Sequence, residues 1–235
     1  MSEARTLNVA RLGVVDYAAA LELQTALAAA RIRDEIDDLL LLLEHPAVFT
    51  LGRGADERFL INPPAEIPIY RVSRGGQVTY HGPGQLVGYP ILKLTGTDRD
   101  VLRYLRNLER VMINALDRCG IAASQRPGLT GVWVDSQKIA SIGVGLRRWV
   151  TMHGFALNVT TDLSAFDTIV PCGIEGCRTT SIAARGRSEL SVTDFAAVIE
   201  KEFAEVFAYE QIVSAPPEAL WRFVASPEGA CEAHG

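Results

Sequence analysis

The segment Gly131-Val-Trp-Val-Asp-Ser-Gln-Lys-Ile-Ala140 holds two mainly apolar stretches around a polar pair. This pattern predicts a hairpin that turns at Asp135-Ser136. Further strands are expected around residues 139–146 and 149–159, so neighbouring strands would run antiparallel. Consecutive antiparallel strands favour an α+β domain over a regular βαβ fold.

The rest of the chain extends this pattern on both sides. The expected strands lie at residues 39–44, 47–51 and 90–94. The expected helices are residues 16–33 capped by Asp16, a helix that opens at Thr97 or Asp98 and stops at Gly120, and one after the Ser191-x-x-Asp194 capping box. The prediction is one α+β domain with mixed, partly antiparallel sheets flanked by helices, over residues 1–213. Residues 214–235 are expected to be a partly ordered tail with a short helix near residues 220–224.

The totals argue against two classes of protein. With 235 residues, a net charge of -5 and a pI of about 5.4, the chain lacks the basic excess of a nucleic-acid binder. Its longest purely apolar run, Leu39–Leu43, is far too short to span a membrane, and no signal peptide is recognised. We therefore expect a cytoplasmic protein with free thiols at its four cysteines and with neither nucleic acid nor membrane as a partner.

The densest turn signals lie in Arg74-Gly-Gly-Gln-Val-Thr-Tyr-His-Gly-Pro-Gly-Gln-Leu-Val-Gly88, with five glycines and one proline in fifteen residues. This composition predicts a long loop rather than regular structure. Such a loop can wrap a ligand with its N–H groups, although a plain loop with tight turns is an equal alternative. The spacing fits neither a Walker A loop nor a dinucleotide fingerprint.

Two side chains are candidates for chemistry. Lys138, one of only three lysines, begins an apolar, glycine-rich strand, and a buried lysine can act as an acid or base. Cys172 lies at a proline-glycine turn that can expose a nucleophile, with N–H groups after Gly173 as candidate oxyanion donors. The alternatives are a solvent-facing lysine and an inert, buried cysteine.

The histidines and the remaining cysteines add less. The four histidines are scattered with no i, i+4 pair, so no metal site is expected. His81 or His153 paired with Cys172 would make a cysteine hydrolase, which stays a rival interpretation. The spacing of Cys177 from Cys172 is not typical of zinc.

Four motifs, taken together and in this order, resemble the octanoyltransferases of lipoate biosynthesis. They are Arg74-Gly-Gly-Gln-Val-Thr-Tyr-His-Gly-Pro-Gly-Gln-Leu, Lys138-Ile-Ala-Ser-Ile-Gly-Val, His153-Gly-Phe-Ala-Leu-Asn-Val and Pro171-Cys-Gly-Ile. The resemblance extends from about Glu44 to Ser181, and it implies a fold like that of biotin- and lipoate-protein ligases, with a sheet-lined acyl tunnel.

The resemblance also implies the site. Cys172 would form an acyl thioester and Lys138 would be its catalytic partner. Residues from three motifs would bind substrate: Arg74, Gly75, Gly76, Gln77, Val78, Thr79, Tyr80, His81, Ser141, Ile142, Gly143, Gly154, Phe155 and Ala156. Glycine and alanine at 140, 143, 145, 154 and 156 are expected to leave room for the acyl chain.

The implied reaction moves an octanoyl group from acyl carrier protein to one lysine of an acceptor protein. The donor carries phosphopantetheine, and neither a metal nor ATP is expected to be required. The implied acceptors are the lipoyl domains of 2-oxoacid dehydrogenase complexes and the glycine cleavage H protein. Five arginines are candidates for a basic docking rim: Arg147, Arg148, Arg178, Arg185 and Arg187.

Two rivals share these features. An ATP-dependent lipoate or biotin ligase would activate a free acid and would not require Cys172. A non-catalytic module would hold acyl groups or lipoyl domains without turnover.

Overall fold

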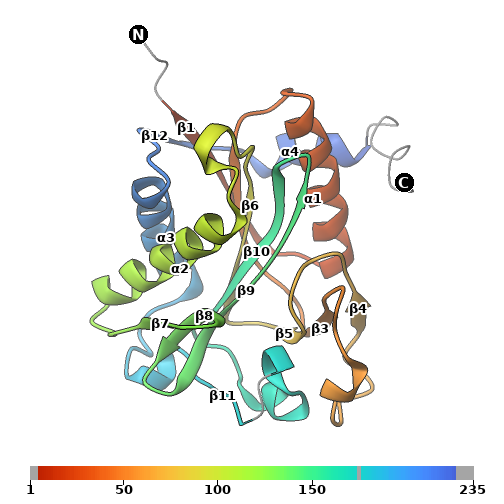
Figure 1. The fold of residues 1–235 in the computed structure, drawn as a ribbon, viewed down its shortest axis with the longest axis vertical. Coiled ribbons are helices and arrows are strands. Elements are labelled where there is room, and N and C mark those ends of the chain that lie inside the picture. Colours follow the sequence, from red (N-terminus) through yellow and green to blue (C-terminus); the bar gives the residue numbers. More distant parts are fainter. Residues whose placement is uncertain (1–4, 174–175, 226–235) are drawn as a thin grey trace.

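A curved central sheet runs through the whole molecule (Figure 1). The computed structural model describes residues 5–173 and 176–225, apart from the side chains of Cys172 and Ala225. The strand order is β12-β1-β2-β6-β10-β9-β8-β7, and β11 pairs with β9 outside this path. The strands are β1 (Thr6–Val14), β2 (Leu39–Glu44), β6 (Gln85–Ile91), β7 (Ser124–Arg126), β8 (Leu129–Val134), β9 (Gln137–Arg147), β10 (Val150–Asn158), β11 (Arg178–Thr179) and β12 (Gln211–Ser214).

The sheet is mixed, as the sequence predicts. β12, β1 and β2 run parallel, whereas β2, β6, β10, β9, β8 and β7 pair antiparallel in turn. The β8–β9 hairpin turns at Asp135, which has a left-handed φ of 52°, so the predicted turn is confirmed. The prediction of one α+β domain with mixed sheets is confirmed.

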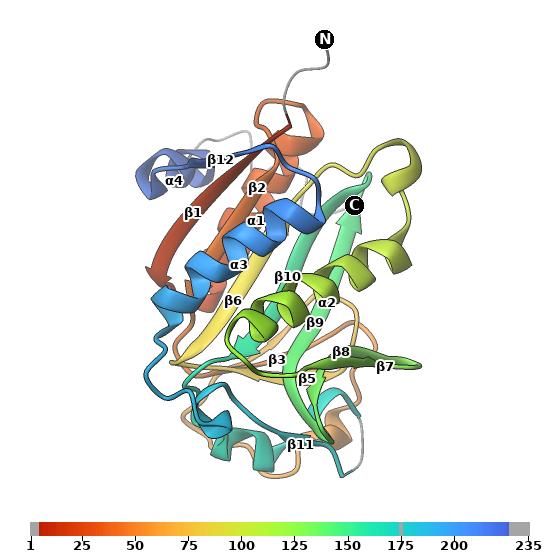
Figure 2. The same ribbon diagram turned by 90° about the vertical axis from the view of Figure 1, so that its left-hand side faces the viewer.

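Helices cover both faces of this sheet (Figure 2). The helices α2 (Val101–Arg118) and α3 (Val192–Val206) pack on one face, in a core that includes Leu108, Phe195 and Phe203. The helices α1 (Tyr17–Ile32) and α4 (Pro217–Ala225) cover the other face. None of the helices in the described ranges is both long and apolar enough to cross a bilayer.

The predicted helix caps are partly correct. Asp16 accepts N–H groups of the first turn of α1, and Ser191 forms a full capping box with Asp194, so both predicted starts are confirmed. The predicted start of α2 at Thr97 or Asp98 is wrong: a 3₁₀ turn occupies Gly96–Asp98, and the cap is Asp100. Leu220 of α4, within the expected tail, is buried against α1 and β1.

A second, three-stranded sheet lies at one end of the molecule (Figure 1). Its order is β4 (Ile69–Arg71), β3 (Val48–Leu51), β5 (Val78–His81). The prediction of an irregular loop over residues 74–88 is therefore wrong for most of its length, because β5 and the start of β6 occupy it. Gly88 is a strand residue whose missing side chain makes room for the ring of Phe155 on β10.

Candidate active site

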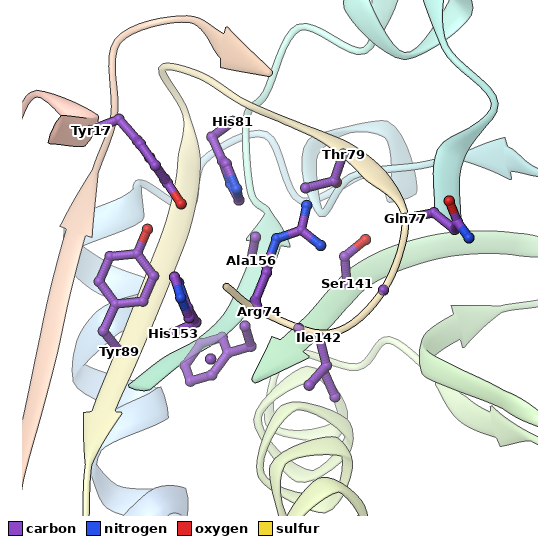
Figure 3. Close-up of a pocket in the computed structure, with 14 residues that line it drawn as sticks. Tyr17, Arg74, Gln77, Thr79, His81, Tyr89, Ser141, Ile142, His153 and Ala156 are labelled. Carbon is purple, nitrogen blue, oxygen red and sulfur yellow. The ribbon is translucent and has the colours of Figure 1, made fainter. Parts of the chain in front are cut away.

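A pocket opens where β5, β6, β9 and β10 meet the start of α1 (Figure 3). Strands from both sheets bring residues that are far apart in sequence to its walls. The lining residues are Tyr17, Arg74, Gly76, Gln77, Thr79, His81, Tyr89, Ser141, Ile142, Gly143, His153, Gly154, Phe155 and Ala156.

Eleven of the fourteen residues predicted to bind substrate line this pocket. The three that do not are Gly75, Val78 and Tyr80. Val78 and Tyr80 point to the opposite face of β5, into a core with Phe49 and Phe166, because side chains alternate along a strand. The role of the eleven residues in binding stays a prediction.

Three lining residues were missed in the sequence: Tyr17, Tyr89 and His153. Tyr17 is the first residue of α1. Tyr89 belongs to β6, whose first residues were predicted to be part of a loop. His153 adopts a left-handed φ of 56° within β10, and its N–H donates to Oε1 of the buried Gln24 at 2.8 Å. The sequence signal for His153 is the His153-Gly154 pair, which opens one of the four motifs and also made His153 a candidate partner of Cys172, but the predicted substrate-binding residues began only at Gly154.

Arg74 lies in the middle of the pocket, and Tyr17, His81, Tyr89 and His153 gather on one side of it (Figure 3). Its side chain is buried, and Nη2 donates to both O and Oγ1 of Thr50, at 2.7 and 2.8 Å. Nη1 donates to the carbonyl of Gly75 at 2.9 Å. The guanidinium is thus fixed as a preorganised positive charge inside the pocket.

Three buried histidines are held in their neutral form: His81 and His153 line the pocket with Arg74, and His45 lies beside His81. Burial lowers the pKa of His45 to about 4. Burial, followed by the neighbouring His45, lowers the pKa of His81 to about 3. Burial and the Arg74 guanidinium lower the pKa of His153 to about 4. These rings act as uncharged hydrogen-bonding groups near pH 7.

The expectation that the glycines leave room for an acyl chain is wrong for two of them. A Cβ on Gly143 would lie 2.8 Å from Cδ of Arg74, and a Cβ on Gly154 would overlap the carbonyl oxygen of Gly88. Both glycines make room for neighbouring protein atoms, so a leucine at 143 would displace Arg74 rather than only shorten a tunnel.

Lys138 is buried, not solvent-facing, with 2% of its surface exposed. Its Nζ donates to the carbonyl of Thr130 at 3.1 Å and lies 5.4 Å from the ring centroid of Trp133. Gly131 passes so close that a Cβ there would lie 2.6 Å from Cε of Lys138. The lysine thus occupies a slot formed by the adjacent strand β8.

The turn that contains Cys172, the predicted nucleophile, lies against the pocket wall. A 3₁₀ turn, Pro171–Gly173, packs against β5, and a Cβ on Gly173 would lie 3.0 Å from Cγ of Gln77. After residues 174–175 the chain returns as β11, where Thr179 pairs with Lys138. The side chain of Cys172 and the predicted oxyanion donors after Gly173 lie outside the described residues.

Among the five candidate rim arginines, Arg185 pairs with Asp135 at 2.8 Å, and Arg187 pairs with Glu189 at 2.5 Å. Arg147, Arg148 and Arg178 are exposed. Within the described ranges, no group of three or more histidine, cysteine, aspartate or glutamate side chains is arranged to hold a metal ion.

Comparison with known sequences gives a family. A family model described as the lipoyl protein ligase A/B catalytic domain matches residues 16–204. The octanoyltransferase of Gloeobacter violaceus is 48% identical over 219 residues, covering 92% of this chain and 96% of the relative. The octanoyltransferase of Solibacter usitatus is 51% identical over 216 residues, covering 90% and 97%.

Solved structures share the fold at low identity. A Plasmodium falciparum protein crystallised with lipoate, LipL1, superposes with a TM-score of 0.72 at 15% identity, covering 95% of this chain and 69% of that one. Lipoate-protein ligase A bound with ATP gives 0.65 at 18%, covering 96% and 97%, and biotin protein ligase from Aquifex aeolicus gives 0.51 at 14%, covering 86% and 69%. The predicted fold is thereby confirmed, and the chain belongs to the octanoyltransferases, the acyltransferases of lipoate biosynthesis within the lipoyl protein ligase A/B family.

Proposed function

We propose that the chain moves an octanoyl group from octanoyl-acyl carrier protein to a specific lysine of lipoyl domains, through a thioester on Cys172 with Lys138 as its partner. One observation carries this proposal: the segment around Cys172 contacts the pocket wall on one side and the strand of Lys138 on the other. Gly173 packs on Gln77 of the pocket wall, and Thr179 pairs with Lys138. Few residues separate these anchors, which supports a shared site for the thiol and the lysine.

In the first step the Cys172 thiolate attacks the thioester carbon of the donor. The new C–S bond replaces the bond to phosphopantetheine, whose sulfur leaves as a thiolate and takes, by way of Lys138, the proton that the Cys172 thiol gave up. An unperturbed cysteine, with a pKa of about 8.5, is only a few per cent ionised at neutral pH. The Lys138 ammonium would stabilise the Cys172 thiolate, and a shift of two pKa units would correspond to about 2.7 kcal/mol.

In the second step the acceptor lysine amine attacks the Cys172 thioester. An amide C–N bond forms, the C–S bond breaks, and the proton lost by the amine returns to the Cys172 sulfur by way of Lys138. Thioester exchange is nearly isoenergetic and amide formation runs downhill, so the proposed route requires neither ATP nor a metal.

Acyl selection would come from the pocket between β5 and β10. Each buried CH2 contributes about 0.8 kcal/mol, and Phe155, Ala156 and Ile142 offer apolar surface for the chain. The proposed acceptors are the lipoyl domains of 2-oxoacid dehydrogenases and the glycine cleavage H protein, with Arg147, Arg148 and Arg178 as steering groups. The cytoplasmic location stays a prediction of the sequence.

Intact-mass spectrometry tests this proposal. The protein is mixed with octanoyl-acyl carrier protein and then with a lipoyl domain. The expected result is an octanoyl adduct on Cys172 that the lipoyl domain discharges, and that is absent in Cys172→Ser. Cys119→Ser and Cys177→Ser are matched controls that should still form it. Full turnover by Cys172→Ser would overturn the proposal.

A second arm separates the ligase rival. Wild type and Cys172→Ser are given free octanoate, ATP and magnesium in place of the carrier-bound donor. Octanoylation of the lipoyl domain by both proteins under these conditions would establish an ATP-dependent ligase. The proposed mechanism expects no transfer from the free acid in either protein.

A further inference from the structure

A continuous chain of buried polar groups leads from the pocket to the strand beside Lys138. Between Arg74 and the carbonyl of Thr180 it passes through Thr50, His81, Gln85 and Asn158. All of these residues are buried. A buried polar network this long is costly unless each group is satisfied, so its layout carries information.

Backbone carbonyls fix the direction of the two amides in this chain. Nδ2 of Asn158 donates to the carbonyl of Thr180 at 3.0 Å, so its Oδ1 must be the atom that faces Gln85. Nε2 of Gln85 donates to the carbonyl of Tyr80 at 3.1 Å and to Oδ1 of Asn158 at 2.9 Å. Oε1 of Gln85 is therefore the acceptor that faces His81, at 2.8 Å from its Nδ1.

This direction sets the tautomer of His81. Since Oε1 of Gln85 can only accept, Nδ1 of His81 carries the proton and Nε2 of the neutral ring is an acceptor. Nε2 faces Oγ1 of Thr50 at 3.4 Å, and that hydroxyl already accepts a bond from Arg74 at 2.8 Å. The Thr50 proton is thus directed at His81. Each group in the series therefore donates to the next one, from Arg74 to the carbonyl of Thr180.

The far end of the chain reaches the catalytic lysine's backbone. The N–H of Thr180 donates to the carbonyl of Lys138 at 2.9 Å, and the N–H of Ile182 donates to the carbonyl of Asn158 at 3.0 Å. Asn158 thereby binds the polypeptide just after β11 twice, through its side chain and through its backbone. β11 is the strand by which the segment after Cys172 returns to the central sheet.

We propose that Gln85 and Asn158 are positioning residues, which hold His81 as the Nδ1–H tautomer at the acyl pocket and fix the 178–182 segment beside Lys138. Neither residue lines the pocket, so each acts through its neighbours. The proposal rests on the proposed function for the role of Lys138, while the tautomer of His81 is independent of it. The ligand class remains the acyl group of the donor.

The experiment compares Gln85→Leu, Asn158→Leu and Asn158→Asp in the full chain with wild type. Gln85→Leu removes the acceptor that faces Nδ1 of His81. Asn158→Leu removes both side-chain hydrogen bonds of Asn158 at similar volume but leaves Nε2 of Gln85 bonded to the carbonyl of Tyr80, whereas Asn158→Asp keeps the acceptor for Gln85 and loses only the donor to Thr180. Two measurements are made: the ¹⁵N shifts of the His81 ring, and the rates of Cys172 acylation and discharge. Tyr209→Phe is the matched control, because it loses one buried hydrogen bond, to Asp38, at the far end of the sheet.

In Gln85→Leu we expect the His81 ¹⁵N shifts to move from the Nδ1–H pattern toward a tautomer mixture, because the acceptor at Nδ1 is gone. In Asn158→Leu we expect the acylation rate to fall about tenfold, because the 178–182 segment loses its side-chain bond beside Lys138. Asn158→Asp should keep the tautomer yet slow acylation, while Tyr209→Phe should change neither. An unchanged His81 spectrum in a folded Gln85→Leu protein, or an unchanged acylation rate in a folded Asn158→Leu protein, overturns the proposal. Full activity of Lys138→Met would instead refute the proposed function and leave the tautomer result standing.

Discussion

The two walls of the pocket are built on opposite principles. The polar wall, residues 74–81, presents Arg74, Gln77, Thr79 and His81, whereas the glycine wall, residues 141–143 and 154–156, presents mostly small side chains (Figure 3). On the polar wall, Arg74 and His81 are held by Thr50 and Gln85.

The polar wall supplies groups for chemistry, whereas the glycine wall sets the spacing between neighbouring strands and side chains. Gly143 admits the side chain of Arg74, and Gly154 admits the backbone of β6 at Gly88. The glycine wall thus determines how close the polar wall can come to β9 and β10. A change on the glycine wall should act first on folding, and a change on the polar wall should act first on the reaction.

The largest expected effect is on the glycine wall. In Gly154→Ala, the new Cβ overlaps backbone of β6 in the centre of the sheet, so the free energy of unfolding should fall by about 4 kcal/mol. Urea denaturation measures this. Gly128→Ala, at the β7–β8 turn with φ of 77° and open space, should cost only about 1 kcal/mol. Equal losses in the two variants would contradict the spacing role of Gly154.

This contrast also explains what the sequence could and could not predict. The β8–β9 hairpin was predictable because its apolar stretches flank a polar turn, and α3 because Ser191 and Asp194 form a complete capping box. β5 and the first part of β6, residues 85–88, were missed because the glycines of the 74–88 segment were counted as strand breakers. The reason for Gly88, the ring of Phe155, lies on a strand some 67 residues later, which no local pattern contains.

The same limit applies to the candidate site. The motifs identified most of the pocket lining, but Tyr17 reaches it from the first turn of α1, where a helix signal concealed any other role. His153 reaches it through a left-handed φ that the sequence does not reveal in a residue other than glycine. Both depend on tertiary packing rather than on local propensity.

On the polar wall, Arg74→Lys should lower kcat/KM for octanoyl-acyl carrier protein about a hundredfold. An ammonium cannot reproduce the fork that bonds both oxygen atoms of Thr50 and the carbonyl of Gly75. Steady-state transfer to a lipoyl domain measures the loss. Arg71→Lys, an exposed arginine on β4 that pairs with Glu57, is the control and should stay within about twofold. A similar loss in both variants would remove the special role of Arg74.

The lowered pKa values of the buried histidines predict how the free energy of unfolding depends on pH. Because the folded protein holds His153 with a pKa of about 4, below its ordinary 6.5, the unfolded chain binds the extra proton first. Stability from this group is complete above pH 6.5 and is lost as the pH falls toward 4. His153→Asn, which tolerates the left-handed φ, should reduce the slope of unfolding free energy by about 1.4 kcal/mol per pH unit in that window. Urea denaturation at a series of pH values measures the slope, and an unchanged slope would show that His153 binds its proton equally in the folded and unfolded states.

The smallest expected effect is on β9, at Gly145, two residues beyond Gly143 of the glycine wall. A Cβ on Gly145 would lie 3.3 Å from Cδ2 of His153 and 3.7 Å from the carbonyl of Ser73, so only a slight shift of the imidazole is needed. Gly145→Ala should therefore change the free energy of unfolding by less than about 1 kcal/mol and kcat/KM by less than about threefold. A loss as large as that of Gly154→Ala would mean that tight spacing extends along the whole β9–β10 pair, and that the distinction between the two walls is not confined to the pocket.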